Sequence, residues 1–275
     1  MELLAELGKR TLVMGILNVT PDSFSDGGHY LEPEQAVAHG LRLIEEGADI
    51  IDIGGESTRP GADPVPAEEE LRRVLPVIEG IRKESDGMIS IDTYKAQVAE
   101  AALAAGAGMV NDISALRFDE RMIDVLVKYD VPVVLMHMQG RPRTMQEKPQ
   151  YDDVIFDIIN FLKERITAAT AAGISTERLI IDPGIGFGKL VEHNLEILRR
   201  LDELKTLERP ILIGPSRKSF IGRLTGAPVE ERLPGTIASL VLGIARGADI
   251  IRVHDVREAK QAIQITDAII RGDQR

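Results

Sequence analysis

The chain has 275 residues, no cysteine and a formal net charge of −11 at pH 7. The lack of cysteine excludes disulfides, thiolate nucleophiles and zinc–thiolate sites, and the acidic balance argues against nucleic acid as the main partner. The N-terminal segment Met1–Lys9 is charged and has no long apolar run, so we expect no signal peptide, no membrane span and a cytoplasmic location.

Eight short apolar runs recur along the chain, and nearly every one ends on a polar or glycine-rich cluster. They are Thr11–Asn18, Asp49–Gly54, Met88–Asp92, Met109–Asp112, Val131–His137, Leu179–Asp182, Pro210–Pro215 and Asp249–His254. Helical periodicity fills the stretches between them. This alternation of strand and helix predicts an α/β fold of the (β/α)8 TIM barrel type, whose usual size is about 250 residues. No linker or low-complexity segment interrupts it, so we expect one domain over residues 1–275.

The helices are predicted from the spacing of apolar residues. One apolar stripe runs from Ala67 to Ile81, on a helix that starts with Glu68–Glu70 and ends with Arg82 and Lys83. Acids at the start and bases at the end suit a helix dipole. Another begins at Val154. A third helix is predicted from the apolar residues Val191, Leu195, Leu198, Leu201 and Leu204. The last is predicted from Ala262, Ile263, Ile269 and Ile270.

A weak internal repeat supports the barrel. The segments that start at Glu46, Ala105 and Arg246 each place Gly-Ala before a buried strand, as expected for a glycine that ends a helix. The alternative architecture is an open doubly wound sheet. It is disfavoured because no G-x-G-x-x-G follows the first strand and eight βα units fill a closed barrel.

Two loops are longer than is usual for such folds. Asn18–Gly28 follows the first strand and Gly54–Pro64 follows the second, and both are rich in Gly, Pro, Ser and Asp. Loops after barrel strands lie on the catalytic face. We therefore expect them to act as lids or substrate clamps rather than as plain surface connections.

Several of the predicted strands have polar residues at or near their carboxyl ends. Asp92, Asn111 and Asp182 point toward the barrel mouth, and Lys218 arrives after the seventh strand. Buried carboxylates require cations or N–H donors, which a flat heterocycle with an amidine-like N–H edge and a carbonyl could supply. The alternative is a buried salt-bridge network in which Lys218 pairs with an aspartate.

A second cluster is cationic. It consists of Arg59 after the second strand, Arg217 after the seventh, and Arg252 with His254 on the eighth. Arg252 and His254 share one strand face because side chains alternate with period two. Loops after strands 7 and 8 often bind phosphate in these barrels, so this cluster predicts an anion site.

A glycine-rich segment, Asp182–Lys189, forms the third signal. Glycines at 184, 186 and 188 would let the backbone approach a ligand closely, and Phe187 could stack on a ring.

Together these segments closely resemble the dihydropteroate synthase family of pterin-binding barrels over the whole chain. The motifs that carry the resemblance are Met14–Gly28, Asp52–Gly61, Ser90–Thr93, Asn111–Ile113, Leu135–Gly140, Asp182–Lys189, Ser216–Ser219 and Arg252–Val256. The resemblance implies a transferase of folate synthesis and a target of sulfonamides. Its reaction would join 6-hydroxymethyl-7,8-dihydropterin diphosphate to 4-aminobenzoate and release pyrophosphate.

The resemblance also implies roles for single residues. The pterin would be held by Asp92, Asn111, Asp182 and Lys218, with Met136 and Phe187 packing on it. The diphosphate would be held by Asn18, Thr58, Arg59, Arg252 and His254, with Asn18 acting through Mg²⁺. The aminobenzoate site would be formed by Phe24, Thr58, Arg59, Pro60 and Ser219. The catalytic set would be Asn18, Asp92, Lys218, Arg252 and His254, and the assembly a homodimer.

The chemistry agrees with these roles. An arylamine is neutral and nucleophilic at pH 7, so the site needs no strong base or covalent nucleophile. The demanding step is departure of the diphosphate, which Mg²⁺, Arg252 and His254 would stabilise. We therefore expect a dissociative substitution.

Three other functions stay open at this point. A pterin-dependent methyltransferase would share the pterin pocket but not need the anion site. A Schiff-base aldolase would use Lys218 as its nucleophile. A non-catalytic protein would bind pterin without releasing pyrophosphate.

Overall fold

The structure is a computed structural model that describes residues 3–20, 33–59 and 61–272. Its strands form one parallel sheet in the order β6-β5-β4-β3-β2-β1-β8-β7. Their bounds are β1 Leu12–Asn18, β2 Ile50–Gly54, β3 Met88–Asp92, β4 Met109–Asp112, β5 Val133–Met136, β6 Leu179–Asp182, β7 Leu212–Ile213 and β8 Ile250–Val253. A parallel bridge between Ile181 and Ile211 joins the two ends of the sheet. The predicted (β/α)8 barrel is therefore confirmed.

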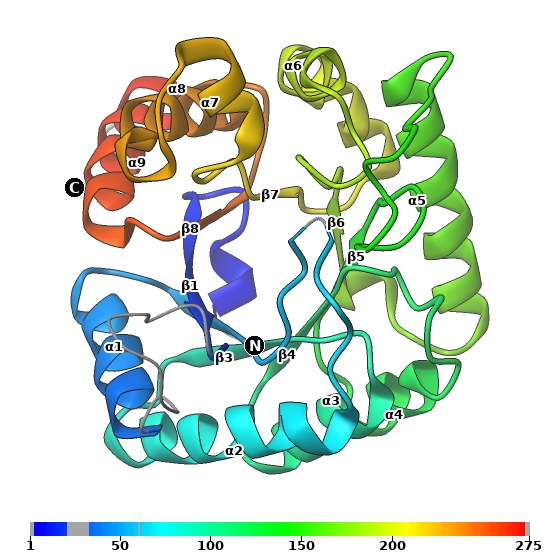
Figure 1. The fold of residues 1–275 in the computed structure, drawn as a ribbon, viewed down its shortest axis with the longest axis vertical. Helices are drawn as coiled ribbons and strands as arrows, with labels where there is room; N and C mark the ends of the chain where they lie inside the picture. Colours follow the sequence, from blue (N-terminus) through cyan, green and yellow to red (C-terminus); the bar gives the residue numbers. More distant parts are fainter. Residues whose placement is uncertain (1–2, 21–32, 60, 273–275) are drawn as a thin grey trace.

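Helices surround the strands on all sides (Figure 1). The α-helices are α1 Pro33–Glu45, α2 Ala67–Glu84, α3 Ala96–Ala104, α4 Met122–Tyr129, α5 Val154–Ala171, α6 Val191–Arg199, α7 Ser219–Thr225, α8 Leu233–Ala245 and α9 Val256–Arg271. Short 3-10 helices are η1 Leu3–Glu6, η3 Thr176–Arg178, η4 Leu201–Leu207 and η5 Val229–Glu231. Within the described part of the chain, none of these helices has the length and apolar character needed to cross a membrane.

Strands β3, β4 and β6 have the predicted bounds. The seventh strand differs most from its prediction. The sequence predicts a strand over Pro210–Pro215, but β7 contains only Leu212 and Ile213. Proline has no N–H to donate to a neighbouring strand, so the two prolines limit the ladder on both sides.

The stripe after Val191 is not one helix. Helix α6 ends at Arg199 and a 3-10 helix, η4, follows. Leu198, Leu201 and Leu204 are three residues apart, and this spacing suits a 3-10 helix as well as an α-helix.

The last predicted apolar stripe is also only partly buried. Its residue Ile269 is 78% exposed, so it does not face the core.

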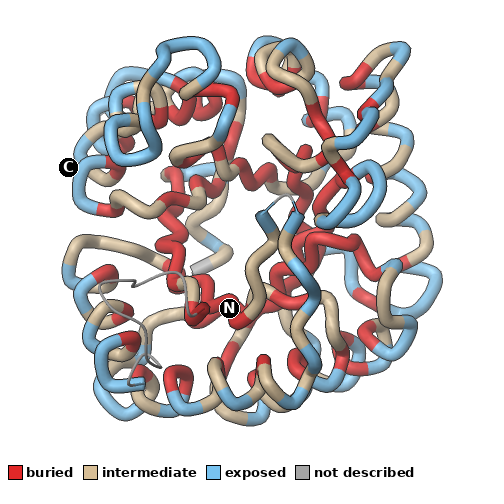
Figure 2. The backbone as a smooth tube through the Cα atoms, in the orientation of Figure 1, coloured by how far each residue is buried: buried red, intermediate tan, exposed pale blue. Residues whose placement is uncertain are grey.

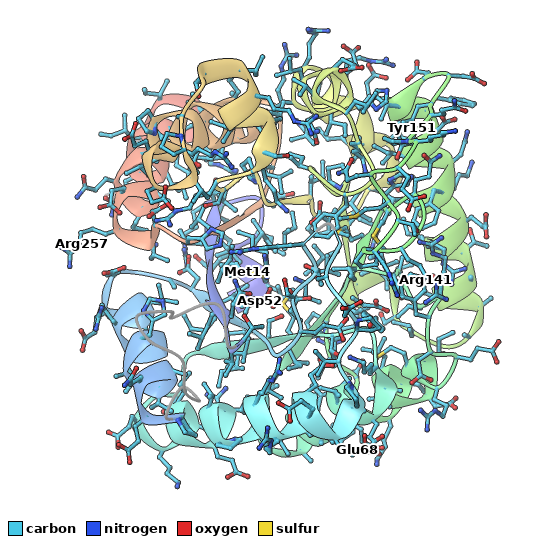
Figure 3. All side chains as sticks on the ribbon, viewed as in Figure 1. Met14, Asp52, Glu68, Arg141, Tyr151 and Arg257 are labelled. Carbon is cyan, nitrogen blue, oxygen red and sulfur yellow. The ribbon has the colours of Figure 1, made fainter. Side chains whose placement is uncertain are left out.

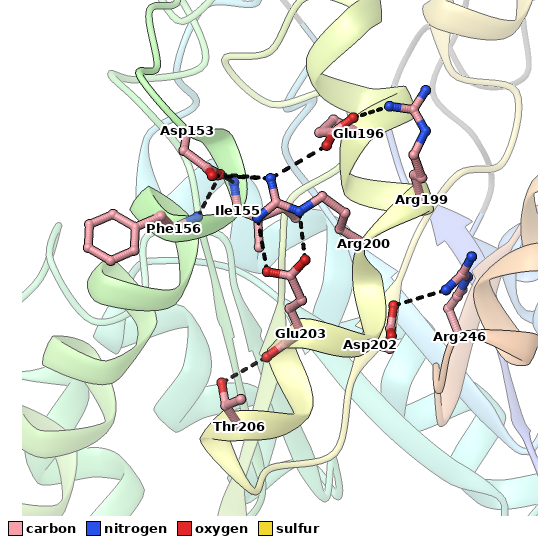
Figure 4. A network of polar contacts seen from close by, with 10 residues as sticks. All are labelled: Asp153, Ile155, Phe156, Glu196, Arg199, Arg200, Asp202, Glu203, Thr206 and Arg246. Carbon is pink, nitrogen blue, oxygen red and sulfur yellow. Dashed lines mark hydrogen bonds and ion pairs between the residues drawn. The ribbon is translucent and has the colours of Figure 1, made fainter.

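Arg200 stabilises the junction between α6 and η4 (Figure 4). Its guanidinium donates to Asp153 at 3.1 Å and to Glu203 at 2.6 and 2.9 Å. Asp153 also caps α5 by accepting from the backbone N–H groups of Ile155 and Phe156. One arginine thus joins the start of α5 to the end of α6.

The buried residues concentrate on the strands and on the inner faces of the helices (Figure 2). Inside the barrel, the end at which the strands begin is apolar and is filled by Leu12, Met14, Ile50, Met109, Val134, Ile180, Leu212 and Ile250. Leu4 and Leu7 pack against this layer. Because the strands alternate, the next inward positions toward their carboxyl ends include Asp52 and Arg252.

The internal repeat has a conformational cause. Gly47, Gly106 and Gly247 have φ values of 103°, 111° and 105°. Residues with side chains rarely adopt this region. Each glycine turns the chain from a helix end into the next strand.

Candidate active site

A pocket opens at the carboxyl end of the barrel. Its lining combines polar strand ends with apolar side chains: Thr58, Asp92, Asn111, Ile113, Met136, Asp182, Ile185, Phe187, Gly214, Lys218 and Arg252. Every residue predicted to bind pterin is in this set. The structure therefore brings together side chains from strands and loops that are far apart in the sequence.

Arg252 lies at the base of this pocket between two carboxylates. Its Nε donates to Asp52 Oδ2 at 2.6 Å and its Nη2 donates to Asp92 Oδ2 at 2.8 Å. Asn111 donates from Nδ2 to the same Asp52 oxygen at 2.9 Å. Figure 3 places Asp52 inside the ring of strands, far from peripheral residues such as Glu68 and Arg257. Asp52 thus orients two predicted ligand-binding residues.

The acids of the pocket bind protons more tightly than free carboxylic acids do. Burial raises the pKa of Asp92 to about 7, against the lowering effect of Arg252. Burial also raises the pKa of Asp182 to about 6, although its Oδ1 accepts a 2.7 Å hydrogen bond from the Gly184 N–H. A ligand that donates N–H groups would stabilise both carboxylates.

Lys218 and Phe187 also line this pocket. Its ammonium lies 4.3 Å from the centre of the Phe187 ring. Burial and the charge of Arg252 lower the pKa of Lys218 to about 8. The lysine is therefore mostly protonated at neutral pH and can donate hydrogen bonds to a ligand carbonyl.

In the segment Asp182–Lys189, two of the three glycines lie against the backbone of a neighbouring loop and leave no room for a ligand. A Cβ at Gly184 would lie 2.0 Å from the carbonyl oxygen of His137, and one at Gly188 would lie 2.7 Å from that of Gln139. Only Gly186 faces Lys218. Two of the three glycines therefore serve the close packing of the β6–α6 loop on the β5–α5 loop.

Lys189 fastens these two loops together. Its buried ammonium lies 3.0 Å from His137 Nδ1 and donates to the carbonyl oxygens of His137 and Phe187 at 3.3 and 2.9 Å. Burial lowers the pKa of Lys189 to about 7. This lysine holds the backbone of Phe187, whose ring lines the pocket.

The β2–α2 loop is held by a separate cluster of charges. Lys95 donates to Glu56 at 2.6 Å and also pairs with buried Glu70. Tyr94 and the Val65 N–H donate to the two oxygens of Glu56 at 2.5 and 2.7 Å. These contacts fix the loop on either side of Thr58 and Arg59.

The predicted cationic cluster carries less charge than the sequence suggests. Arg217 pairs through two nitrogens with Asp255, so part of its charge is offset and its guanidinium is already engaged. Burial and the neighbouring cations Arg252, Arg217 and Lys218 lower the pKa of His254 to about 3. His254 is therefore an uncharged hydrogen-bonding group, and the prediction that it adds a positive charge is wrong.

Several predicted residues lie outside the pocket lining. Asn18 ends β1 and is half-buried, Arg59 and Ser219 are exposed, and His254 follows β8. Phe24 and Pro60 lie outside the described residues. Across residues 3–20, 33–59 and 61–272, no group of three or more His, Cys, Asp or Glu side chains could hold a metal.

Asp52 is the main residue of the site that the sequence reasoning missed. It occupies an inward position on β2, between Ile50 below and Gly54 above. Strand alternation could have placed it in the barrel. Its function is visible only from its contacts with Arg252 and Asn111.

Residues 14–254 match the family of pterin binding enzymes. The dihydropteroate synthase of Clostridium beijerinckii is 50% identical over 96% of both chains. That of Escherichia coli K12 is 48% identical over 94% of this chain and 91% of its own length. The structure of Xanthomonas albilineans dihydropteroate synthase with 4-aminobenzoic acid has a TM-score of 0.89 at 53% identity, covering 94% of this chain and 93% of that one. The chain belongs to the dihydropteroate synthase family of pterin binding enzymes.

Proposed function

We propose that this chain joins 6-hydroxymethyl-7,8-dihydropterin diphosphate to 4-aminobenzoate, giving 7,8-dihydropteroate and pyrophosphate. One observation carries the proposal: Asp92, Asn111 and Asp182 line a single pocket together with Lys218 and Phe187. The Xanthomonas albilineans enzyme has been solved with 4-aminobenzoic acid and with 7,8-dihydropteroate, and this supports the assignment.

The pterin is assigned to the base of the pocket. Asp182 and Asp92 would accept from its N–H groups, and Lys218 would donate to its carbonyl. Asn111 has its Nδ2 committed to Asp52, so its side-chain oxygen is the atom that we assign to the ligand. Met136 and Phe187 would pack on the ring faces.

The diphosphate is assigned to Arg252, His254, Asn18, Thr58 and Arg59. Arg252 already uses Nε and Nη2 toward the two aspartates, so Nη1 is the nitrogen that we assign to the anion. His254 would act as a neutral N–H donor. Thr58 lines the pocket from the β2–α2 loop.

We propose that Mg²⁺ accompanies the diphosphate. The described residues fit a metal held mainly by phosphate oxygens and water, because they offer the Asn18 side-chain oxygen but no cluster of acids. Magnesium commonly keeps several waters and few protein ligands at phosphate sites. When bound, it would neutralise negative charge on the leaving group.

The reaction exchanges one bond for another at the pterin methylene carbon. The C–O bond breaks and its electron pair leaves with the diphosphate, and the arylamine lone pair forms the C–N bond. The amine then loses a proton to the released pyrophosphate or to water. Arg252 and His254 stabilise the departing charge, while Asp92 and Asp182 favour the electron-poor pterin.

The aminobenzoate is assigned to Thr58, Arg59 and Ser219, together with Phe24 and Pro60. Ser219 is the first residue of α7 and is exposed beside the mouth. Sulfonamides resemble an arylamine acid, and the Yersinia pestis enzyme has been solved with a sulfonamide drug complex. We propose that these compounds occupy the same site here.

We also propose a homodimer. Leu242 of α8 and Ile265 and Ile269 of α9 are large apolar side chains that are 58%, 65% and 78% exposed. Helices α8 and α9 pack against each other, so these residues belong to adjoining elements. Sedimentation of the wild type and of Ile269→Glu tests this: the variant should be monomeric, and an unchanged dimer would place the interface elsewhere.

A pyrophosphate-release assay tests the proposed reaction. Release should require both the pterin diphosphate and 4-aminobenzoate, with an equal amount of dihydropteroate detected by mass spectrometry. A methyltransferase or a simple pterin-binding protein would release no pyrophosphate. Trapping of a carbonyl substrate on Lys218 by borohydride would instead indicate an aldolase.

A further inference from the structure

Ser216 and His254 form a paired contact between the loops after β7 and β8. The Oγ of Ser216 accepts a 3.2 Å hydrogen bond from the backbone N–H of His254. The same Oγ lies 3.0 Å from Nδ1 of the His254 ring. One buried hydroxyl thus contacts both the backbone and the side chain of a residue assigned to the diphosphate.

The direction of the second hydrogen bond follows from the hydroxyl hydrogen. A serine hydroxyl has one hydrogen to donate, and Ser216 is only 3% exposed. No other acceptor for this hydrogen is found among the described residues. If Nδ1 carried the ring proton, the hydroxyl hydrogen would be buried without a partner, which is unfavourable. The Ser216 hydroxyl therefore donates to Nδ1.

The surroundings keep the ring neutral and the contact rigid. Arg252, Arg217 and Lys218 oppose a positive imidazole, and burial acts in the same direction. Asp255, an acid that acts against this lowering, is held by two nitrogens of Arg217. Arg217 also donates its backbone N–H to Thr236 at 3.0 Å. Arg217, which follows Ser216 in the chain, is thus held through both its backbone and its side chain.

We propose that Ser216 is a positioning residue that fixes His254 as the Nε2–H tautomer. This inference rests on the proposed function, in which His254 contacts the diphosphate. With Nδ1 accepting from Ser216, the proton is on Nε2, which points away from the serine. The ring then offers a hydrogen-bond donor to the departing anion. The other tautomer would present a lone pair and repel it.

The tautomer can be measured directly by nitrogen NMR of protein labelled with ¹⁵N in histidine. The chain has five histidines, and the His254 signals are assigned by their loss in His254→Gln. The variants are Ser216→Ala, which removes the hydroxyl, and Ser216→Thr, which keeps it. Ser239→Ala is the matched control, because Ser239 is also buried but donates to the Gly235 carbonyl on α8.

The expected result is a protonated Nε2 in the wild type, in Ser216→Thr and in Ser239→Ala. Ser216→Ala should show the Nδ1–H tautomer or a mixture. Its affinity for pyrophosphate should fall about tenfold, equivalent to one hydrogen bond of about 1.4 kcal/mol. Pterin affinity, measured alone by calorimetry, should stay within twofold.

An unchanged tautomer in Ser216→Ala, or a wild type protonated on Nδ1, would overturn the proposal. Equal losses of pterin and pyrophosphate affinity would also overturn it, because they would indicate a general disturbance of the barrel mouth. The proposed function fails differently. It fails if the wild type binds no pyrophosphate, whereas the tautomer is read in the free protein.

Discussion

Arg252 and Asp52 are 200 positions apart in the sequence and form a 2.6 Å charged hydrogen bond inside the barrel. Asp52 is fully buried, and its Oδ2 also accepts from Asn111. Asp52 is not among the residues that line the pocket, and it orients one residue assigned to the diphosphate and one assigned to the pterin.

Asp52→Asn should weaken both the fold and pyrophosphate binding. Removing one partner of a buried ion pair usually costs about 3–5 kcal/mol, and the asparagine keeps the shape of the side chain. Chemical denaturation measures the free energy of unfolding, and calorimetry measures pyrophosphate affinity. Asp63→Asn is the control, because Asp63 is 83% exposed. If both quantities matched the wild type, Asp52 would not orient Arg252.

Asp182→Asn should reduce pterin affinity. It keeps the acceptor for the Gly184 N–H but removes the charge that favours ring N–H donors. The loss should be about 1–3 kcal/mol, or roughly tenfold to a hundredfold in the dissociation constant. Calorimetry with pterin alone gives the value. Unchanged affinity in both Asp182→Asn and Asp182→Ala would remove Asp182 from the pterin site.

The same substitution should make the protein more stable above pH 6. Burial raises the pKa of Asp182 from 3.8 to about 6, so the folded protein binds this proton more tightly than the unfolded chain. Wild-type stability therefore falls as the pH rises from about 4 to 6, by about 3 kcal/mol for this group. Asparagine does not titrate.

The stability difference between Asp182→Asn and the wild type is the quantity to follow. It should increase between pH 4 and 6 and then level off, as measured by denaturation at each pH. A difference that is flat over this range would show that the carboxyl is not perturbed in the folded protein.

Lys189→Met should destabilise the β6–α6 loop. The substitution removes a buried donor to the carbonyl oxygens of His137 and Phe187. A loss of about 1–3 kcal/mol in the free energy of unfolding is expected, together with weaker pterin binding because Phe187 is no longer held. Lys128→Met is the control, since Lys128 is 61% exposed and its pair with Glu100 contributes little. Equal effects of both substitutions would contradict the role of Lys189.

The barrel could be predicted because its signals are local. Buried strands, periodic helices and the glycines at 47, 106 and 247 each follow from backbone conformation and apolar spacing. The break after Arg199 could not be predicted, because leucines three residues apart suit both types of helix. The short β7 follows from its flanking prolines only when the neighbouring strands are known.

The residues predicted to bind pterin do line one pocket, but the pairing and protonation of the charged groups around it were not predicted. Strand ends identify Asp92, Asn111 and Asp182, whereas the pairing of Arg217 with Asp255 depends on how two loops meet. The neutrality of His254 likewise depends on cations that come from separate strands and loops. The roles of Asp52 and Ser216 are set by contacts over long sequence distances, which residue spacing does not contain.

The central claim is that the site stabilises the departing diphosphate rather than activating the amine. Positional isotope exchange tests it most directly, using pterin diphosphate labelled with ¹⁸O in the bridge between carbon and phosphorus. With enzyme, magnesium and an inert analogue of 4-aminobenzoate, the label should move into non-bridging oxygens, and Arg252→Ala should slow this exchange. The claim would be contradicted if no label moved and the rate with 4-aminobenzoate analogues rose steeply with the basicity of the arylamine.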